Sequence, residues 1–271
     1  SIVDTNIDKY AFVTEKSISK CKEYQDIVDH VDAVSIVTPT SSHFKIAKYF
    51  LEKKIHVLLE KPMTETVAQA KKLNNIAKKN NCILQIGHLE QFNPAIRKIR
   101  KSNCKPQFIE VHRLCQFNPR ANDVDVVLDL MIHDIDIVLS LIDKPIKNIE
   151  VSGKKILTKL TDIANVRIKF EDNIVANLTA SRISTKNERK MRIFSDSSYY
   201  SIDFINNELK QVVKDKKNNF KIKDFSFKKT DVLYEEINNF IKTCLGKEKS
   251  MTTGYSGEKA LIVAKKITRN F

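Results

Sequence analysis

The chain has 271 residues, of which 42% are hydrophobic and 30% charged, so it is long enough for two domains with ordinary cores. It contains no run of about 18 apolar residues, which excludes a membrane-spanning helix, and nothing in it resembles a secretory leader. Lys and Arg outnumber Asp and Glu by 47 to 33, but no nucleic-acid motif accompanies this excess. The charge therefore favours a basic surface that attracts an anionic substrate over a nucleic-acid interface. Five cysteines without a C-x-x-C pair indicate a cytoplasmic protein without disulfides or a zinc site.

The first 90 residues alternate short apolar strands with helices. Strands are predicted at residues 1–4, 18–21, 32–37, 55–59 and 82–86, and helices at 9–16, 24–29, 42–53 and 64–80. This alternation is typical of β-α-β units on a parallel, doubly wound sheet with helices on both faces. None of the five glycines precedes Gly87, so this part of the chain contains no G-x-G-x-x-G phosphate loop.

After Pro94 the pattern changes to successive strands. A helix at 94–101, a strand at 107–112 and a helix at 126–141 are followed by strands at 148–151, 165–170, 174–180, 190–194, 199–204, 209–213 and 220–227 and by helices at 231–244 and 256–267. The short connections, with a hairpin turn at Asp172 and Asn173, predict a largely antiparallel sheet with helices on one face. We therefore expect an incomplete Rossmann domain over residues 1–93 and an α+β domain over residues 94–271.

Polar side chains follow several of the predicted parallel strands, at the carboxyl ends where open α/β sheets bind ligands. Asp4 ends the first strand and is suited to accept the ribose hydroxyls of an adenosine, although an acid in a strand-ending turn is also common. The run TPTSSH at residues 38–43 follows another strand, and its small hydroxyl residues allow close approach of a cofactor. Alternatively, Ser41 or Ser42 caps the helix that follows.

Two further strand ends carry candidate site residues. Lys61 precedes Pro62, which restricts it to extended conformations and so aims its side chain. Its ammonium group can bind a substrate hydroxyl and assist proton loss, whereas the alternative is an ordinary surface lysine before a turn. The segment GHLEQFNP at residues 87–94 joins the two predicted domains. Its polar side chains are suited to line a cleft there, and in the alternative interpretation the segment is only a linker.

The helix predicted over residues 126–141 places Asp129, His133 and Asp136 on one face. A carboxylate one turn before a histidine orients the imidazole and raises its basicity, as a general base requires. In the alternative interpretation the acids cap the helix and His133 is a surface residue. A metal-dependent hydrolase that also uses Asp134 is disfavoured, because the four residues do not all share one side of a helix.

The combination of these motifs resembles one family. Thr38-Pro39-Thr40 with His43, then Glu60-Lys61-Pro62, then GHLEQFNPA, then LDLMIHDIDIV occur in the order and spacing of that family. It is the glucose–fructose oxidoreductase, inositol dehydrogenase and MocA-type (Gfo/Idh/MocA) family of NAD(P)-dependent dehydrogenases. The resemblance covers nearly the whole chain and is strongest to the bacterial UDP-N-acetylglucosamine 3-dehydrogenase-like members.

The resemblance implies specific roles. Lys61, Asp129 and His133 would be catalytic, with His133 the proton acceptor and Asp129 its partner. The residues implied to bind the cofactor are Asp4, Thr38, Pro39, Thr40, His43, Glu60 and Lys61; those implied to bind substrate are Asn93, Arg120, Asp125, Asp129 and His133. NAD is expected rather than NADP, with no metal, no nucleic acid and no membrane. A homo-oligomer, dimeric or tetrameric, would form through the sheet of the second domain.

The absent glycine loop departs from the family pattern, in which a strand and that loop precede the segment equivalent to SIVD. The sequence predicts either a fragment of a longer protein or a truncated gene product with weakened NAD binding. The expected function is NAD-dependent oxidation of a secondary hydroxyl of a nucleotide sugar, sugar or polyol. The alternative is a non-catalytic remnant, or a sugar-binding or scaffold protein of the same fold with impaired NAD binding.

Overall fold

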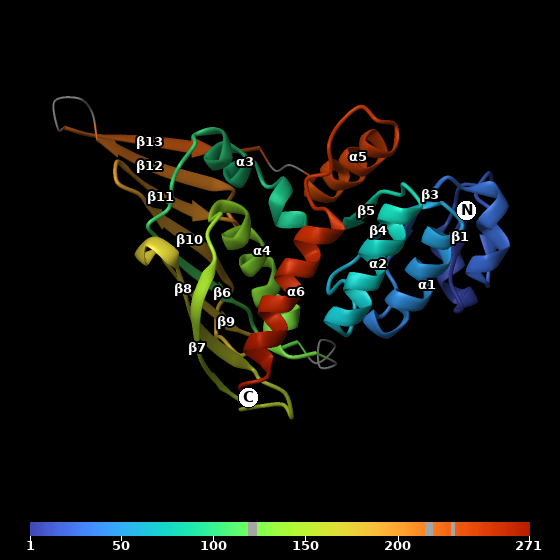
Figure 1. Cartoon of the computed structure of the whole chain (residues 1–271), viewed down its shortest axis with the longest axis horizontal. Coiled ribbons are helices and arrows are strands. Elements are labelled where there is room, and N and C mark those ends of the chain that lie inside the picture. The colour runs from blue at the N-terminus through green and yellow to red at the C-terminus, as the bar shows by residue number, and fades with distance from the viewer. Residues whose placement is uncertain (119–123, 215–218, 229–230) are drawn as a thin grey trace. The chain divides into compact units, whose positions relative to one another are not determined.

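The computed structural model of the protein describes residues 1–118, 124–214, 219–228 and 231–271. The chain forms two compact units (Figure 1). The first contains Ser1–Gly87 and Phe240–Gly254, and the second contains His88–Asn239 and Tyr255–Phe271. None of the helices in the described part of the chain is long and apolar enough to cross a membrane.

The first unit contains two parallel sheets. Strands β1 (Ile2–Val3) and β2 (Lys20–Cys21) form one sheet, and β3 (Ala33–Ile36), β4 (His56–Leu59) and β5 (Leu84–Ile86) form the other in that order. Two 3₁₀ helices, η1 (Ile7–Phe12) and η2 (Tyr24–His30), lie close to where the sequence predicts helices. In a Rossmann sheet the first strand lies between the positions of β1 and β3, and no strand of the described residues takes that place.

Two α-helices cover the three-stranded sheet. Helix α1 (Thr40–Glu52) buries Phe50 and Leu51, and α2 (Val67–Lys79) buries Leu73. A capping box starts α2, in which Thr66 and Gln69 each bind the other's backbone N–H.

The prediction that Ser41 or Ser42 caps α1 is wrong. The helix begins earlier, after Pro39, and has no side-chain cap. Instead the Ser42 hydroxyl donates to the Thr38 hydroxyl at 2.7 Å and lies 2.8 Å from the Pro39 carbonyl oxygen. This serine therefore stabilises the turn before the helix.

A late segment of the chain completes the first unit. It runs from the end of helix α5 (Val232–Cys244) to the start of helix α6 (Gly254–Thr268). The Thr252 carbonyl accepts a 2.8 Å hydrogen bond from the Ile86 N–H, and the Gly254 carbonyl accepts one of 3.1 Å from Asn74. These bonds attach residues 240–254 to β5 and α2, although more than 150 residues separate them in the sequence.

An eight-stranded sheet forms most of the second unit, in the order β13-β12-β11-β10-β6-β9-β8-β7. The strands are β6 (Phe108–Leu114), β7 (Ile146–Lys154), β8 (Ile163–Phe170), β9 (Val175–Ser181), β10 (Glu188–Phe194), β11 (Ser198–Asp203), β12 (Glu208–Lys214) and β13 (Phe220–Ser226). All neighbouring pairs are antiparallel except β6 with β9. The predicted turn at Asp172 and Asn173 is confirmed; both residues have positive φ, 57° and 59°, between β8 and β9.

The two faces of this sheet differ. Along β6, Ile109, Val111 and Arg113 are buried, while Glu110 and His112 point to the opposite face. Helices α4 (Ile132–Leu141) and α6 lie on one side of the sheet (Figure 1). The predicted fold class, a Rossmann-like domain followed by a largely antiparallel α+β domain, is confirmed.

Candidate functional site

The candidate cofactor residues of the first unit follow the aligned ends of three parallel strands. Ile36 pairs with Leu59, and Leu59 pairs with Ile86, so β3, β4 and β5 end at the same level. Thr38, Glu60 and Lys61 come directly after the first two of these ends. The structure thus brings them to the carboxyl edge of the sheet, where α/β folds bind nucleotides.

His43 connects two of the loops at this edge. Its side chain is buried, with Nε2 2.7 Å from the Thr38 carbonyl oxygen and Nδ1 3.0 Å from the Pro62 carbonyl oxygen. The imidazole therefore fixes the turn after β3 relative to the cis Lys61–Pro62 peptide. Its contribution to this edge is to hold the backbone of both loops in place.

The first unit carries several groups that suit a dinucleotide, while its described residues contain no G-x-G-x-x-G loop for the pyrophosphate. Val37 is 71% exposed, and the following Thr38 and Pro39 are exposed as well, so the backbone after β3 is accessible. Thr40 begins α1 beside them. The Asp4 carboxylate, after β1, is half-buried and accepts a 2.8 Å hydrogen bond from the Asn6 N–H, which fixes its direction. A carboxylate in this position suits ribose hydroxyls, so these residues fit an NAD-type cofactor.

Glu60 lies directly against the backbone of Gly87. A Cβ atom built on Gly87 would lie only 2.8 Å from Glu60 Oε2. The same carboxylate oxygen accepts a 3.2 Å hydrogen bond from the Lys61 N–H. Only glycine leaves room for this carboxylate between the ends of β4 and β5.

We expect Gly87→Ala to weaken NAD binding without unfolding the protein. The new methyl group would displace the flexible end of Glu60, and losing one charged hydrogen bond corresponds to about tenfold in affinity. Titration calorimetry with NAD measures this, and Glu60→Gln, which keeps the shape and removes the charge, is the matched comparison. Unchanged affinity in both variants would show that Glu60 does not contact the cofactor.

In the second unit, Asp129 and His133 lie on either side of a change in helix type. Asp129 belongs to a π-helical turn, η4 (Val127–Met131), closed by a hydrogen bond from the Ile132 N–H to the Val127 carbonyl. His133 belongs to the regular helix α4, and both side chains are half-buried. π turns inserted in α-helices occur frequently at functional sites.

Asp136 does not share the exposure of these two residues. It is 3% exposed and accepts a hydrogen bond from the Gln91 amide. The predicted common face assumes a regular α-helix from residue 126 onwards, and the π turn changes the position of Asp129 relative to the other two residues. His133 and Asp136 share the regular helix α4, but Asp136 is buried against Gln91. Asp136 therefore serves packing, and Asp129 with His133 remains the candidate pair.

A buried ion pair fixes α4 directly after His133. Arg113 of β6 binds Asp134 through two nitrogens, Nε at 2.9 Å from Oδ2 and Nη2 at 2.8 Å from Oδ1. Its third donor, Nη1, lies 3.1 Å from Glu90 Oε1. Burial by itself lowers the pKa of the Arg113 guanidinium, but the two carboxylates raise this pKa above its usual range, so the charge persists.

The candidate substrate residues Asp125 and Asn93 are both helix caps in this structure. Asp125 Oδ1 accepts from the N–H groups of Val127 and Leu128 at 2.8 and 3.1 Å, and Asn93 Oδ1 accepts from the Ala95 N–H at 2.9 Å, starting α3 (Pro94–Lys101). Arg120, the remaining candidate, lies outside the described residues.

The loop between β7 and β8 supports the start of the helix that carries Asp129. The Thr161 carbonyl accepts a 3.0 Å hydrogen bond from the Val126 N–H. The neighbouring Asp162 is buried and accepts hydrogen bonds from the N–H groups of residues 156–158 and from the Thr158 hydroxyl. Burial alone raises the pKa of Asp162, but these hydrogen bonds outweigh it and lower the pKa to about 2.

We expect this carboxylate to contribute an acid-sensitive part of the stability. Because the folded-state pKa of Asp162 lies below the unfolded-state value, its contribution of about 2 kcal/mol is present above pH 4 and is lost as the pH falls towards 2. Urea unfolding at pH 5, 4, 3 and 2 measures it. Asp162→Asn should be less stable at pH 5 and lose less stability on acidification; parallel curves for the two proteins would contradict this.

Two contributors to this region are not among the predicted site residues. His88 is 2% exposed, and its ring centroid lies 6.2 Å from that of His133. Arg113 is buried within a strand whose other inward residues are apolar. A charged residue at an inward position of an alternating strand is the signal that identifies Arg113, whereas no local signal distinguishes His88.

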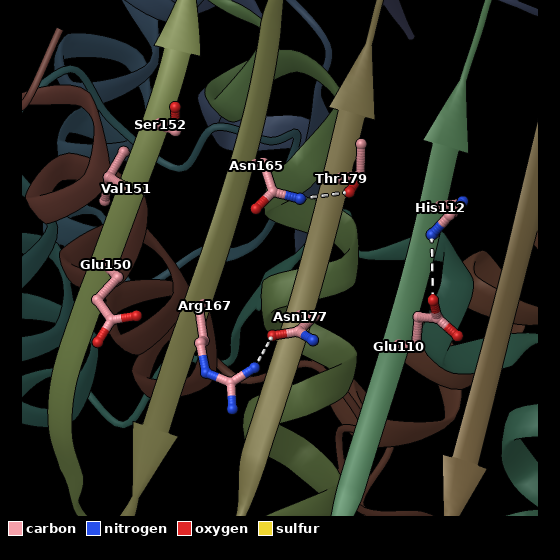
Figure 2. A pocket seen from close by; sticks show the side chains of 9 residues that line it. All are labelled: Glu110, His112, Glu150, Val151, Ser152, Asn165, Arg167, Asn177 and Thr179. Atoms are coloured by element: carbon pink, nitrogen blue, oxygen red, sulfur yellow. Dashed lines mark hydrogen bonds and ion pairs between the residues drawn. The ribbon is translucent and has the colours of Figure 1, made fainter.

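The opposite face of the large sheet is open and polar. A hollow of about 380 Å³ is lined by Glu110, His112, Glu150, Val151, Ser152, Asn165, Arg167, Asn177 and Thr179. Figure 2 shows these side chains projecting from neighbouring strands. Asn165 donates to Thr179 at 2.8 Å and Arg167 donates to Asn177 at 3.1 Å. Paired polar groups on an open sheet face are suited to contact another polar surface.

The comparisons with known proteins agree with this geometry. A family model described as "Oxidoreductase family, NAD-binding Rossmann fold" matches residues 1–88, and one described as "GFO/IDH/MocA C-terminal domain" matches residues 106–200. These matches, together with the fold, define an oxidoreductase of the Rossmann type. The chain belongs to the Gfo/Idh/MocA oxidoreductase family.

Several relatives have known activities or structures. A UDP-N-acetylglucosamine 3-dehydrogenase from Acidithiobacillus ferrooxidans is 37% identical over 212 residues, which cover 77% of this chain and 67% of the relative. The solved structure of a protein of that name and organism, GnnA, covers 98% of this chain and 87% of its own, with 32% identity and a TM-score of 0.92. Levoglucosan dehydrogenase in complex with NADH shares the fold, with a TM-score of 0.88 at 15% identity, over 99% of this chain and 86% of its own.

Proposed function

We propose that the protein is an NAD-dependent dehydrogenase that oxidises a secondary hydroxyl of a nucleotide sugar of the UDP-N-acetylglucosamine type. The observation that carries this proposal is the 37% identity to a relative named for that activity. It is supported by the half-buried Asp129 and His133, whose helix a buried ion pair fixes in place.

Each candidate catalytic residue has a distinct role in this proposal. His133 accepts the proton of the hydroxyl that is oxidised, and Asp129 stabilises the imidazolium that forms. Lys61 donates a hydrogen bond to the same hydroxyl and stabilises the developing negative charge on its oxygen. Bound NAD supplies the hydride acceptor. The reaction would leave a ketone, with the hydride carried by the reduced cofactor and the proton by His133, which returns it to solvent.

We propose that the protein prefers NAD over NADP and that Asp4 causes this preference. Its carboxylate is held by the Asn6 N–H and would repel the 2′-phosphate of NADP. Asp4→Asn should therefore lower the ratio of the kcat/KM measured with NAD to the kcat/KM measured with NADP. An unchanged ratio would remove Asp4 from the cofactor site.

The test of the proposed reaction is production of NADH, followed by its absorbance, when the protein is mixed with NAD and UDP-N-acetylglucosamine. A panel of inositols, hexoses and other UDP-sugars defines the substrate class. No NADH with any of them would refute the dehydrogenase proposal. Calorimetry with NAD separates that proposal from the non-catalytic alternative, because micromolar binding argues for a retained cofactor site.

We further propose that the protein forms a homo-oligomer through the open face of the large sheet. The support is the paired polar face around Arg167 and Asn177 (Figure 2). Sedimentation measures the oligomeric state. Arg167→Glu, which reverses one charge in the middle of this face, should shift the protein towards the monomer, and an unchanged oligomer would place the interface elsewhere.

A further inference from the structure

His88 has no part in the chemistry proposed above, yet it contacts the candidate base. It precedes the short η3 helix (Leu89–Phe92) and is 2% exposed. Its ring is almost perpendicular to that of His133, at 89°, with 6.2 Å between the centroids. Edge-to-face packing at such separations is a favoured arrangement of aromatic rings.

Two side-chain contacts hold the segment that contains His88 against α4. Gln91 donates a hydrogen bond to Asp136, three residues after His133. Glu90 accepts a 3.1 Å hydrogen bond from Arg113, which also binds Asp134, the residue directly after His133. The η3 segment is therefore joined to the helix at two points close to His133, and the ring contact is a fixed part of the second unit.

Hydrogen bonding at Nδ1 does not explain the position of His88. Nδ1 is buried and has no hydrogen-bond partner among the residues that the structure describes. An unsatisfied buried polar atom lowers stability, whereas an apolar ring of the same shape does not. The ring packing against His133 is thus the interaction that the structure gives for this buried side chain.

We propose that His88 is a positioning residue for His133. Its ring holds the His133 imidazole in one orientation, so that the proton-accepting nitrogen stays directed at the substrate hydroxyl. This proposal rests on the proposed function, in which His133 is the base. Misorienting a base lowers the rate of the chemical step more than it weakens substrate binding.

Three substitutions separate the ring from the nitrogen. His88→Leu removes the flat ring and should lower kcat about tenfold, with KM changed by less than about threefold. His88→Phe keeps a ring and should restore most of this loss. His88→Asn keeps a nitrogen without a ring and should resemble the leucine variant. As a control, His30→Leu alters an exposed histidine of the first unit and should leave turnover unchanged.

A second measurement does not depend on turnover. The imidazole C–H signals of His133 in proton NMR, assigned by their loss in His133→Asn, report the neighbouring ring. They should shift in His88→Leu and His88→Asn and stay close to the native positions in His88→Phe. Thermal unfolding of each variant identifies any that fails to fold, and His88→Phe should be at least as stable as the native protein.

The outcomes separate this inference from the proposed function. Native turnover in His88→Leu, or activity in His88→Asn without activity in His88→Phe, would overturn the positioning role. Full activity of His133→Ala would instead refute the assignment of the base. In that case, the His133 signals still decide whether His88 orders the ring, and unchanged signals in His88→Leu would overturn the proposal.

Discussion

His133→Ala is expected to lower kcat at least about 100-fold, the usual contribution of a positioned general base. Without the imidazole, the hydroxyl proton has no acceptor when hydride leaves the carbon. Lys61→Ala should cause a loss of similar size, because the ammonium no longer stabilises the developing charge on the oxygen. Steady-state kinetics with NAD and the best substrate of the panel measures both effects.

Two controls make these losses specific. Added imidazole should recover part of the activity of His133→Ala, since it replaces the missing base, but should not recover that of Lys61→Ala. NAD binding by His133→Ala should equal that of the native protein in calorimetry. Near-native turnover of either variant would exclude that residue from the chemistry.

Breaking the buried ion pair should have the largest effect on stability. Asp134→Ala leaves the Arg113 guanidinium buried, with only Glu90 as a partner, and removing one member of such a pair costs about 3–5 kcal/mol of unfolding free energy. Arg113→Met should be comparably damaging, because the buried Asp134 and the half-buried Glu90 then lose their cation. Urea unfolding at pH 7 measures both variants.

The matched control is an exposed ion pair of similar length. Lys242 and Glu248 lie 2.9 Å apart with both side chains more than 40% exposed. Lys242→Met should change the unfolding free energy by less than about 1 kcal/mol. If the buried and exposed pairs gave equal losses, the Arg113 cluster would not be the fixed support of α4.

The secondary structure of this protein can largely be predicted from its sequence, because it depends on local periodicity. The period-two alternation of Phe108–Leu114 and Val175–Ser181 determines both strands, and both are confirmed within one or two residues. The first two predicted helices are less accurate, because the structure has only short 3₁₀ helices there, at residues 7–12 and 24–30. Segments of six or seven residues carry too little periodic signal to separate these states.

The candidate site could be predicted only in part. Motifs such as Glu60-Lys61-Pro62 are contiguous, and their position after a strand places them at a ligand-binding edge. Local pattern says less about the region around His133. The sequence pattern predicts a regular helix there, whereas the π turn before Ile132 changes which residues lie beside Asp129.

The sequence by itself determined the family, the two kinds of sheet and the order of the motifs, because each depends on residues close together in the chain. Only the tertiary structure decided what surrounds His133. Arg113 reaches Asp134 across 21 residues and Gln91 reaches Asp136 across 45. Such partners are selected by burial, since a charged or amide group enclosed in the core must find a hydrogen bond wherever the fold provides one. His88 reaches His133 in the same way, through packing that no local pattern encodes.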